Sequence, residues 1–365
     1  MPAANEIFDP AAAQDRHFDF VVPVGPLHPR CTAPVQRESQ VFEVDGGVSG
    51  LDHDVSIRDK NIPKRHHRLV LSLYRFKCGA QASRMRGLRP PLPPRLAASS
   101  NREVDGMPML LENRVALIVG GGTGLGRAIA IAYAAAGAKL AVADLAAGPA
   151  EETLALAGRS AEGLPLAMDV SRIADIRAGV RAVVERFGRL DILVNCAAIC
   201  HVDPLLEVPP DRFDQVFDVN TRGAFYCMTV AAEAMLPRTF GRIITITTPA
   251  SRLATPLFAT YGASKAAVDS FVRSCAVAWA ADGITVNSIA PGRMTGGMVD
   301  ALDRDLARLS GQDPAALTAA RTQSLPMQRR VDPAEVAAAA VWLASDAAAY
   351  VTAERVNFTG GMELA

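Results

Sequence analysis

Short runs of apolar and β-branched residues recur through the last two thirds of the chain and alternate with longer stretches of helical periodicity. The runs have the length and composition of buried strands and lie at residues 114–120, 138–145, 164–168, 190–197, 241–248, 284–290 and 354–358. The stretches at 149–158, 172–187, 210–236, 260–281 and 333–345, and the residues after the first run, are predicted to be helices. This alternation predicts an α/β domain, a doubly wound parallel sheet of about seven strands with helices on both faces.

Residues 1–108 lack this rhythm. They hold half of the chain's 24 prolines, which interrupt every candidate element except a short one near 69–76. We therefore expect a largely disordered, Pro/Arg-rich extension, followed by a single domain over 109–365. Two alternatives remain open. The extension is a basic arm that binds nucleic acid or a partner, or it is a gene-model artefact and the natural start lies near Met107 or Met109.

Composition narrows the class of protein. Lys+Arg and Asp+Glu are balanced at 38 each, which argues against a nucleic-acid partner, and the hydrophobic half of the 365 residues suits a sizeable core. The six cysteines are scattered, which favours free thiols in a reducing compartment. No apolar run in the sequence reaches the roughly 20 residues that a membrane-spanning helix needs. The simplest expected location is the cytoplasm.

A glycine-rich loop, VGGGTGLGRAIA at 119–130, joins the first predicted strand to a helix. Gly120, Gly124 and Gly126 allow a tight turn and a close approach of the backbone to a phosphate. The helix start, which includes Leu125, offers unpaired N–H groups to the same ligand. A glycine cluster alone is a weak signal, but between a buried strand and a helix it predicts a Rossmann-type dinucleotide site.

The acidic residue that follows this loop predicts which dinucleotide binds. Asp144 ends the second predicted strand, where a carboxylate can accept hydrogen bonds from the adenosine ribose hydroxyls and would repel a 2′-phosphate. Arg127 is a nearby basic residue, but it falls inside the predicted helix. The predicted cofactor is therefore NAD rather than NADP.

Tyr261 and Lys265 are four residues apart, so they share one face of the predicted helix at 260–281. A tyrosine with its ordinary pKa of about 10 is a poor base at neutral pH. An ammonium about 4 Å away favours the phenolate by roughly 4 kcal/mol at an effective dielectric of about 20. That energy corresponds to a pKa lower by about three units. The pair is therefore a candidate general acid/base site, and an ordinary solvated helix pair is the alternative.

The glycine spacing, the Tyr-x3-Lys pair and the strand rhythm together resemble the short-chain dehydrogenase/reductase family over residues 110–362. The resemblance implies an oxidoreductase that transfers a hydride between a nicotinamide cofactor and a secondary alcohol or ketone. It implies a catalytic asparagine at Asn220 and further cofactor contacts at Asp169, Val170, Asn195, Ala197, Pro291, Gly292 and Thr295. Three positions depart from the family pattern, namely Val119, Cys196 and Ala198.

The catalytic hydroxyl is a further departure. The family's serine corresponds to Thr248, which keeps the hydroxyl but adds a methyl group. Ser251 is a substitute candidate, but Thr248 occupies the matching register at the end of a strand. By resemblance, Thr248 orients the substrate oxygen and Tyr261 transfers the proton. Lys265 lowers the tyrosine pKa and holds the nicotinamide ribose, while Asn220 positions a water that relays protons.

The remaining segments carry weaker signals. Residues 293–330 are expected to form a mobile substrate lid, whose Met and Leu residues favour an apolar or ring-shaped substrate. Cys196, Cys200 and His201 form a C-x3-C-H cluster, but a fourth ligand is not evident in the sequence, so no metal site is predicted.

The resemblance also implies a homodimer or homotetramer, in which the helix at 260–281 and the long helix before it pair subunits; an intramolecular contact is the alternative. Three other functions remain open. They are an NADPH-dependent 3-oxoacyl-thioester reductase, a dinucleotide-binding sensor without catalysis, and a nucleic-acid-associated enzyme that uses the basic arm.

Overall fold

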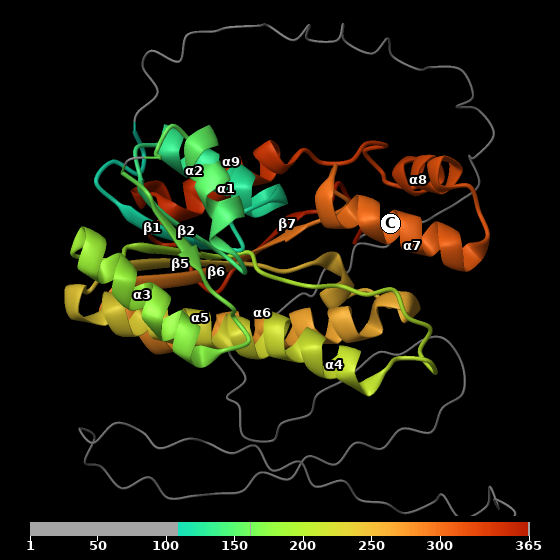
Figure 1. Ribbon diagram of the computed structural model, residues 1–365, viewed down its shortest axis with the longest axis horizontal. Coiled ribbons are helices and arrows are strands. Elements are labelled where there is room, and N and C mark those ends of the chain that lie inside the picture. The colour runs from blue at the N-terminus through green and yellow to red at the C-terminus, as the bar shows by residue number, and fades with distance from the viewer. Residues whose placement is uncertain (1–108, 161, 364–365) are drawn as a thin grey trace, which may run out of the picture. The chain divides into compact units, whose positions relative to one another are not determined.

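The strands of the protein form one parallel sheet in the computed structural model, which describes residues 109–160 and 162–363 (Figure 1). The expectations for residues 1–108 lie outside the described residues. The strands are β1 (Val115–Val119), β2 (Lys139–Asp144), β3 (Leu164–Ala167), β4 (Ile192–Asn195), β5 (Gly241–Ile246), β6 (Ile284–Pro291) and β7 (Arg355–Phe358). Every predicted strand is confirmed, with ends that differ by no more than two residues.

The order of the strands across the sheet is β3-β2-β1-β4-β5-β6-β7, and every pairing is parallel. The direction in which successive strands are added therefore reverses at β1, which has β2 on one side and β4 on the other. In an open sheet of this kind ligands bind outside the carboxyl ends of the strands at the switch point. The predicted Rossmann-type fold is confirmed, and its switch point lies directly beside the glycine loop.

Helices cover both faces of the sheet, as Figure 1 shows. One face carries α1 (Gly124–Ala135), α2 (Ala147–Leu156) and α9 (Pro333–Ala344), and the other carries α3 (Ile173–Phe187), α5 (Ala224–Met235) and α6 (Ala259–Trp279). Tyr133 of α1 is fully buried and donates a hydrogen bond to the carbonyl of Ala340 in α9 at 2.9 Å. In the part of the chain that the structure describes, no helix is long and apolar enough to cross a membrane.

The prediction of one continuous α-helix at 210–236 is wrong in one respect. The stretch consists of α4 (Pro210–Phe217), a π-helical segment (Asp218–Gly223) and α5. Gly223, at the end of this segment, lies close to the loop after β3, where a Cβ would come within 2.8 Å of the carbonyl oxygen of Val170. A π turn is frequent at functional sites, and this one contains Asn220.

Two helices that the sequence pattern did not reveal, α7 (Gly297–Ser310) and α8 (Pro314–Gln323), lie between β6 and α9. Asp303 of α7 is 2% exposed and forms ion pairs with Arg321 of α8 and with Arg330. Its carboxylate also accepts a hydrogen bond from Thr318. The two helices are therefore joined by a buried, charge-paired contact.

A second buried ion cluster holds the end of the sheet to the loop after β5. Arg355 of β7 pairs with Asp269 of α6 at 3.4 Å and with Glu363 at 2.5 Å, and all three side chains are less than 10% exposed. The same guanidinium donates a hydrogen bond to the carbonyl of Thr248 at 2.9 Å. Arg355 therefore fixes the backbone of the residue predicted to supply the catalytic hydroxyl.

Replacing this arginine tests how much the cluster stabilises the fold. Arg355→Met should lower the free energy of unfolding by about 3–5 kcal/mol, because Asp269 and Glu363 would stay buried without their shared cation. The measurement is urea unfolding followed by circular dichroism. The matched control is Arg308→Met, which removes an exposed ion pair with Asp305 and should cost at most about 1 kcal/mol. Equal unfolding midpoints for the two variants would contradict the interpretation.

Candidate active site

A cavity of about 1180 Å³ opens at the carboxyl ends of the central strands, where the switch point predicts a ligand. Most of the predicted site residues line it: Gly120, Gly124, Leu125, Asp144, Asp169, Val170, Ala197, Thr248, Tyr261, Lys265, Pro291, Gly292 and Thr295. Gly126, Asn195 and Asn220 lie behind the lining. The structure therefore brings the predicted cofactor loop and the predicted catalytic groups into one space.

The glycine loop packs backbone against backbone. A Cβ on Gly126 would lie 2.0 Å from the carbonyl oxygen of Gly120, and a Cβ on Gly120 would lie 2.6 Å from the backbone nitrogen of Ala197. Gly120 also has a φ of +73°, in the left-handed region that favours glycine. No side chain in the described residues caps the N-terminus of α1 at Thr123, and both Thr123 and Gly124 line the cavity. This cradle fits the pyrophosphate of a dinucleotide.

Asp144 anchors the glycine loop and also lines the cavity. Its carboxylate accepts hydrogen bonds from the backbone N–H groups of Gly122 and Leu145, both at 2.8 Å, and so ties the glycine loop to the end of β2. It also lines the cavity. Arg127 is turned to other partners, because its guanidinium binds the carbonyl of Gly122 and pairs with Glu152 at 2.8 Å.

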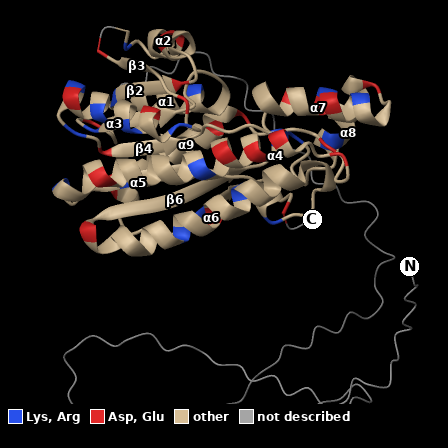
Figure 2. Cartoon of the chain, turned by 60° about the horizontal axis from the view of Figure 1, so that its bottom comes forward, with Lys and Arg blue, Asp and Glu red and all other residues tan. Residues whose placement is uncertain are grey.

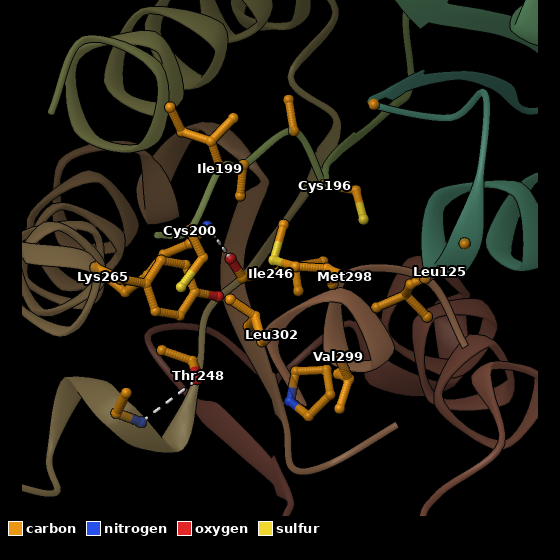
Figure 3. Close-up of a pocket in the computed structure, with 18 of the residues that line it drawn as sticks. Leu125, Cys196, Ile199, Cys200, Ile246, Thr248, Lys265, Met298, Val299 and Leu302 are labelled. Carbon is orange, nitrogen blue, oxygen red and sulfur yellow. Dashed lines mark hydrogen bonds between the residues drawn. The ribbon is translucent and has the colours of Figure 1, made fainter. Parts of the chain in front are cut away.

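The predicted catalytic groups come from two elements. Thr248 follows β5 and begins a short 3₁₀ turn, while Tyr261 and Lys265 lie on the first turns of α6. Lys265 is 2% exposed, and its Nζ donates a hydrogen bond to the carbonyl of Ile246 at 2.8 Å. Figure 3 shows Lys265, Thr248 and Cys200 around the same part of the cavity.

Burial shifts the pKa values of both titratable groups. It raises the pKa of the Tyr261 phenol well above its ordinary value, Cys200 raises it further, and the Thr248 hydroxyl acts in the opposite direction. Burial also lowers the pKa of Lys265 to about 8. The expectation that the ammonium brings the phenol pKa close to neutrality is therefore wrong for the protein's own groups. The cost of a buried phenolate exceeds the stabilisation that the protein supplies.

The choice of Thr248 over Ser251 agrees with the geometry. The Ser251 hydroxyl lies 2.6 Å from Asp269 and 2.8 Å from the Thr248 carbonyl, and the residue lies outside the cavity lining. The Thr248 side chain lines the cavity and accepts a hydrogen bond from the N–H of Ala250 at 3.4 Å. Of these two hydroxyls, that of Thr248 is the one that a substrate in the cavity can reach.

The side-chain amide of Asn220 forms hydrogen bonds with other groups of the protein. The amide accepts from the N–H of Ile199 and donates to the carbonyl of the same residue, both at 2.8 Å, and it donates to the Ser264 hydroxyl at 3.1 Å. Both amide hydrogens are therefore used, and the side chain is fully buried. These bonds tie the Ile199 segment, which lines the cavity, to α6. Asn195 is also buried, and its amide nitrogen finds no hydrogen-bond partner among the described residues.

Two of the three residues of the predicted Cys196, Cys200 and His201 cluster line the cavity. Cys196 and Cys200 line the cavity, and burial raises the pKa values of their thiols to about 11 and about 12. His201 lies outside the lining. Over residues 109–160 and 162–363, no group of three or more His, Cys, Asp or Glu side chains is arranged to hold a metal ion.

Sequence reasoning missed most of the apolar wall. Its members come from three separate segments: Ile199 and Cys200 after β4, Leu253, Leu257 and Phe258 before α6, and Met298, Val299, Leu302 and Leu306 of α7. Only the Met and Leu content of the 293–330 segment gave a signal. Figure 3 shows Ile199, Met298 and Leu302 in one close-up with Thr248, although they lie far apart in the sequence.

Known dehydrogenases and reductases are similar to this chain over the residues that form the sheet and the cavity. The family described as "Enoyl-(Acyl carrier protein) reductase" matches residues 120–363. A galactitol 2-dehydrogenase of Agrobacterium fabrum is 38% identical over 254 residues, which cover 69% of this chain and 98% of the relative. A 3-oxoacyl-[acyl-carrier-protein] reductase of a Synechocystis species is 32% identical over 255 residues, with coverage of 69% and 98%.

Among solved structures, that of an NAD⁺-bound xylitol dehydrogenase is 28% identical with a TM-score of 0.66, and the match covers 69% of this chain and 99% of that one. The chain belongs to the short-chain dehydrogenase/reductase family. The prediction of an NAD(P)-dependent oxidoreductase that acts on alcohols or ketones is confirmed at this level.

The glycine contact gives a direct test of the cofactor cradle. Gly126→Ala should weaken NADH binding at least about tenfold, or 1.4 kcal/mol, because the added methyl group cannot coexist with the Gly120 carbonyl. The measurement is a titration of NADH fluorescence. The matched control is Gly148→Ala, where the Cβ would meet open space; it should bind NADH normally and raise stability by up to about 1 kcal/mol. Unchanged binding in the Gly126 variant would contradict the cradle.

Proposed function

We propose that this protein is an NAD-dependent dehydrogenase of secondary alcohols, and of their ketones in the reverse direction, with Tyr261 as the general acid/base. The observation that carries the proposal is the convergence of Thr248, Tyr261 and Lys265 in the cavity that the glycine cradle opens into. A helix pair without function would have no reason to face such a cradle.

Each of the protein's own groups has a separate role in the reaction. The glycine loop would hold the pyrophosphate of a bound dinucleotide, and Pro291, Gly292 and Thr295 would hold its nicotinamide, which would supply the hydride acceptor or donor. Thr248 donates a hydrogen bond to the substrate oxygen and orients it. Tyr261 removes the hydroxyl proton in oxidation and returns a proton to the carbonyl oxygen in reduction.

Lys265 makes the proton transfer feasible although burial opposes it. With a pKa of about 8, its ammonium is mostly protonated at pH 7 and stabilises the phenolate as it forms. An oxidised nicotinamide brings a second positive charge to the same site. Because Lys265 is buried, its charge acts more strongly there than in solvent. Asn220 acts as a positioning residue that holds the Ile199 wall.

The preference for NAD over NADP rests on two side chains. Asp144 offers a carboxylate at the end of β2, where the 2′-hydroxyl of a ribose would bind and a 2′-phosphate would be repelled. Arg127, the nearby cation, is engaged by Glu152 and the Gly122 carbonyl, so its charge is already paired.

The Synechocystis relative favours a 3-oxoacyl-thioester reductase as the second candidate. The rim of the cavity argues against it. Asp211, Asp214 and Asp218 line the mouth along and just after α4, and Figure 2 shows the acidic residues of this helix. The thioester carriers of acyl groups bear phosphates, which such a rim would repel. An uncharged substrate suits this mouth better.

We also propose a homodimer or homotetramer in the cytoplasm. The support is the family resemblance together with the surface of α5 and α6. These helices lie on the same face of the sheet, and most of their residues are uncharged. Sedimentation of the full-length protein measures the assembly, and a monomer at micromolar concentration would contradict it.

The role of Tyr261 is tested by removing one oxygen atom. Tyr261→Phe should lower kcat by about 10²–10⁴-fold, the usual contribution of a general acid or base, while NADH binding stays within about twofold because the ring remains. Tyr350→Phe is the matched control, since Tyr350 is fully exposed, and it should keep full activity. Because burial raises the phenol pKa, alcohol oxidation by the parent enzyme should rise with pH, and the residual rate of the variant should lose this dependence. Parent-level turnover by the Tyr261→Phe enzyme would refute the assignment.

The cofactor preference is tested by removing the carboxylate. The parent protein should favour NAD, and Asp144→Ser should lower the ratio of kcat/KM for NAD over NADP by about 100-fold, since each lost charge-assisted hydrogen bond costs about 1.5–3 kcal/mol. Glu151→Gln, an exposed change on α2, is the control and should leave the ratio unchanged. A parent enzyme that prefers NADP would contradict the proposal and favour the thioester reductase.

A further inference from the structure

A second, smaller cavity of about 290 Å³ adjoins the first. It is lined by Leu257, Leu306, Leu309, Ser310, Gln312, Leu317 and Arg321. Three of these residues, Leu257, Leu306 and Arg321, also line the main cavity. The two spaces are therefore neighbours that share a wall made of the segment before α6 and of the α7–α8 pair.

The lining of the second cavity is mainly apolar, with Ser310, Gln312 and Arg321 as its polar members. Four of its seven residues are leucines. Arg321 pairs with Asp303 at 2.8 Å, and the Ser310 hydroxyl donates to the carbonyl of Leu306 at 2.8 Å. The charge of Arg321 is thus neutralised and the Ser310 hydroxyl is engaged inside the protein, while Gln312 is exposed and Leu309 is 47% exposed at the outer edge. The chemistry of this space suits hydrocarbon rather than a hydroxylated or charged group.

The substrate half of the main cavity has the same character. Figure 3 shows Ile199, Cys200, Met298 and Leu302 lining the region that contains Thr248. A polyol carries a hydroxyl on every carbon, and each hydroxyl that loses water without finding a partner costs about 1–3 kcal/mol. The named substrates of the galactitol and xylitol dehydrogenases are therefore poorly matched to this wall.

We propose that the substrate is an uncharged secondary alcohol or ketone with an extended apolar body, whose reactive carbon lies at Tyr261 and whose apolar tail passes Leu257 and Leu306 into the second cavity. The inference rests on the proposed function and specifies the substrate class of that same site. The carboxylates at α4 disfavour anions, the apolar part of the wall disfavours polyols, and the adjoining, mainly apolar space accommodates length.

A homologous series of alcohols tests this directly. With full-length enzyme and NAD, kcat/KM measured by NADH absorbance should rise about fourfold per added methylene from 2-butanol to 2-octanol, which is the fold-change equivalent to about 0.8 kcal/mol per buried CH₂. Galactitol and xylitol should give values at least about 100-fold below that of 2-octanol, because their hydroxyls lose hydration without finding partners.

A pair of variants on α7 locates the tail. Leu309→Trp fills the second cavity and should lower kcat/KM for 2-octanol at least about tenfold while leaving 2-butanol within about twofold. Arg308→Trp is the matched control, because its side chain is 78% exposed and lies outside both linings; it should change neither value. Unfolding midpoints confirm that both variants are folded.

The outcomes distinguish a failure of the proposed tail site from a failure of the proposed dehydrogenase function. Turnover of polyols or of 2-butanol with no gain per methylene, or equal losses for short and long alcohols in Leu309→Trp, would overturn the tail site and leave the dehydrogenase intact. No turnover of any alcohol or ketone in the series with either NAD or NADP would overturn the proposed function and the substrate class together.

Discussion

The contact between the backbones of Gly126 and Gly120 is the constraint on which the site depends. It lets the loop lie flat over the ends of β1 and β4, so that the N-terminus of α1 faces the cavity. The Asp144 carboxylate then holds Gly122 to the end of β2 and still lines the same space. Any side chain at position 126 would lift the helix from the strand, and the cradle and the cofactor pocket would be lost together.

The chemistry of the site is controlled by burial. Tyr261 and Lys265 sit in a space where desolvation moves both pKa values toward the neutral forms, the phenol upward and the ammonium down to about 8. A proton transfer there depends on charges that arrive with the ligands as well as on the lysine. The buried Arg355 cluster adds rigidity, because its guanidinium fixes the Thr248 backbone.

The cavity combines a charged mouth with an apolar interior. The carboxylates at α4 lie at the rim, while the residues of α7 supply methionine and leucine inside. Asp303 holds α7 and α8 together through Arg321 and Arg330, so the apolar wall and the second cavity belong to one paired unit of helices. The carboxylates at the rim therefore disfavour anionic substrates, and the apolar residues inside favour apolar substrates.

Local patterns in the chain were sufficient for the strands, most helices, the glycine loop and the Tyr261–Lys265 pair, because periodicity and fixed spacing are properties of neighbouring residues. They did not reveal the Asp269–Arg355–Glu363 cluster or the second cavity, since these join residues far apart in the sequence. The pKa of Tyr261 was misjudged for the same reason: spacing places an ammonium beside a phenol, but the cost of burying the phenolate depends on how every surrounding segment packs.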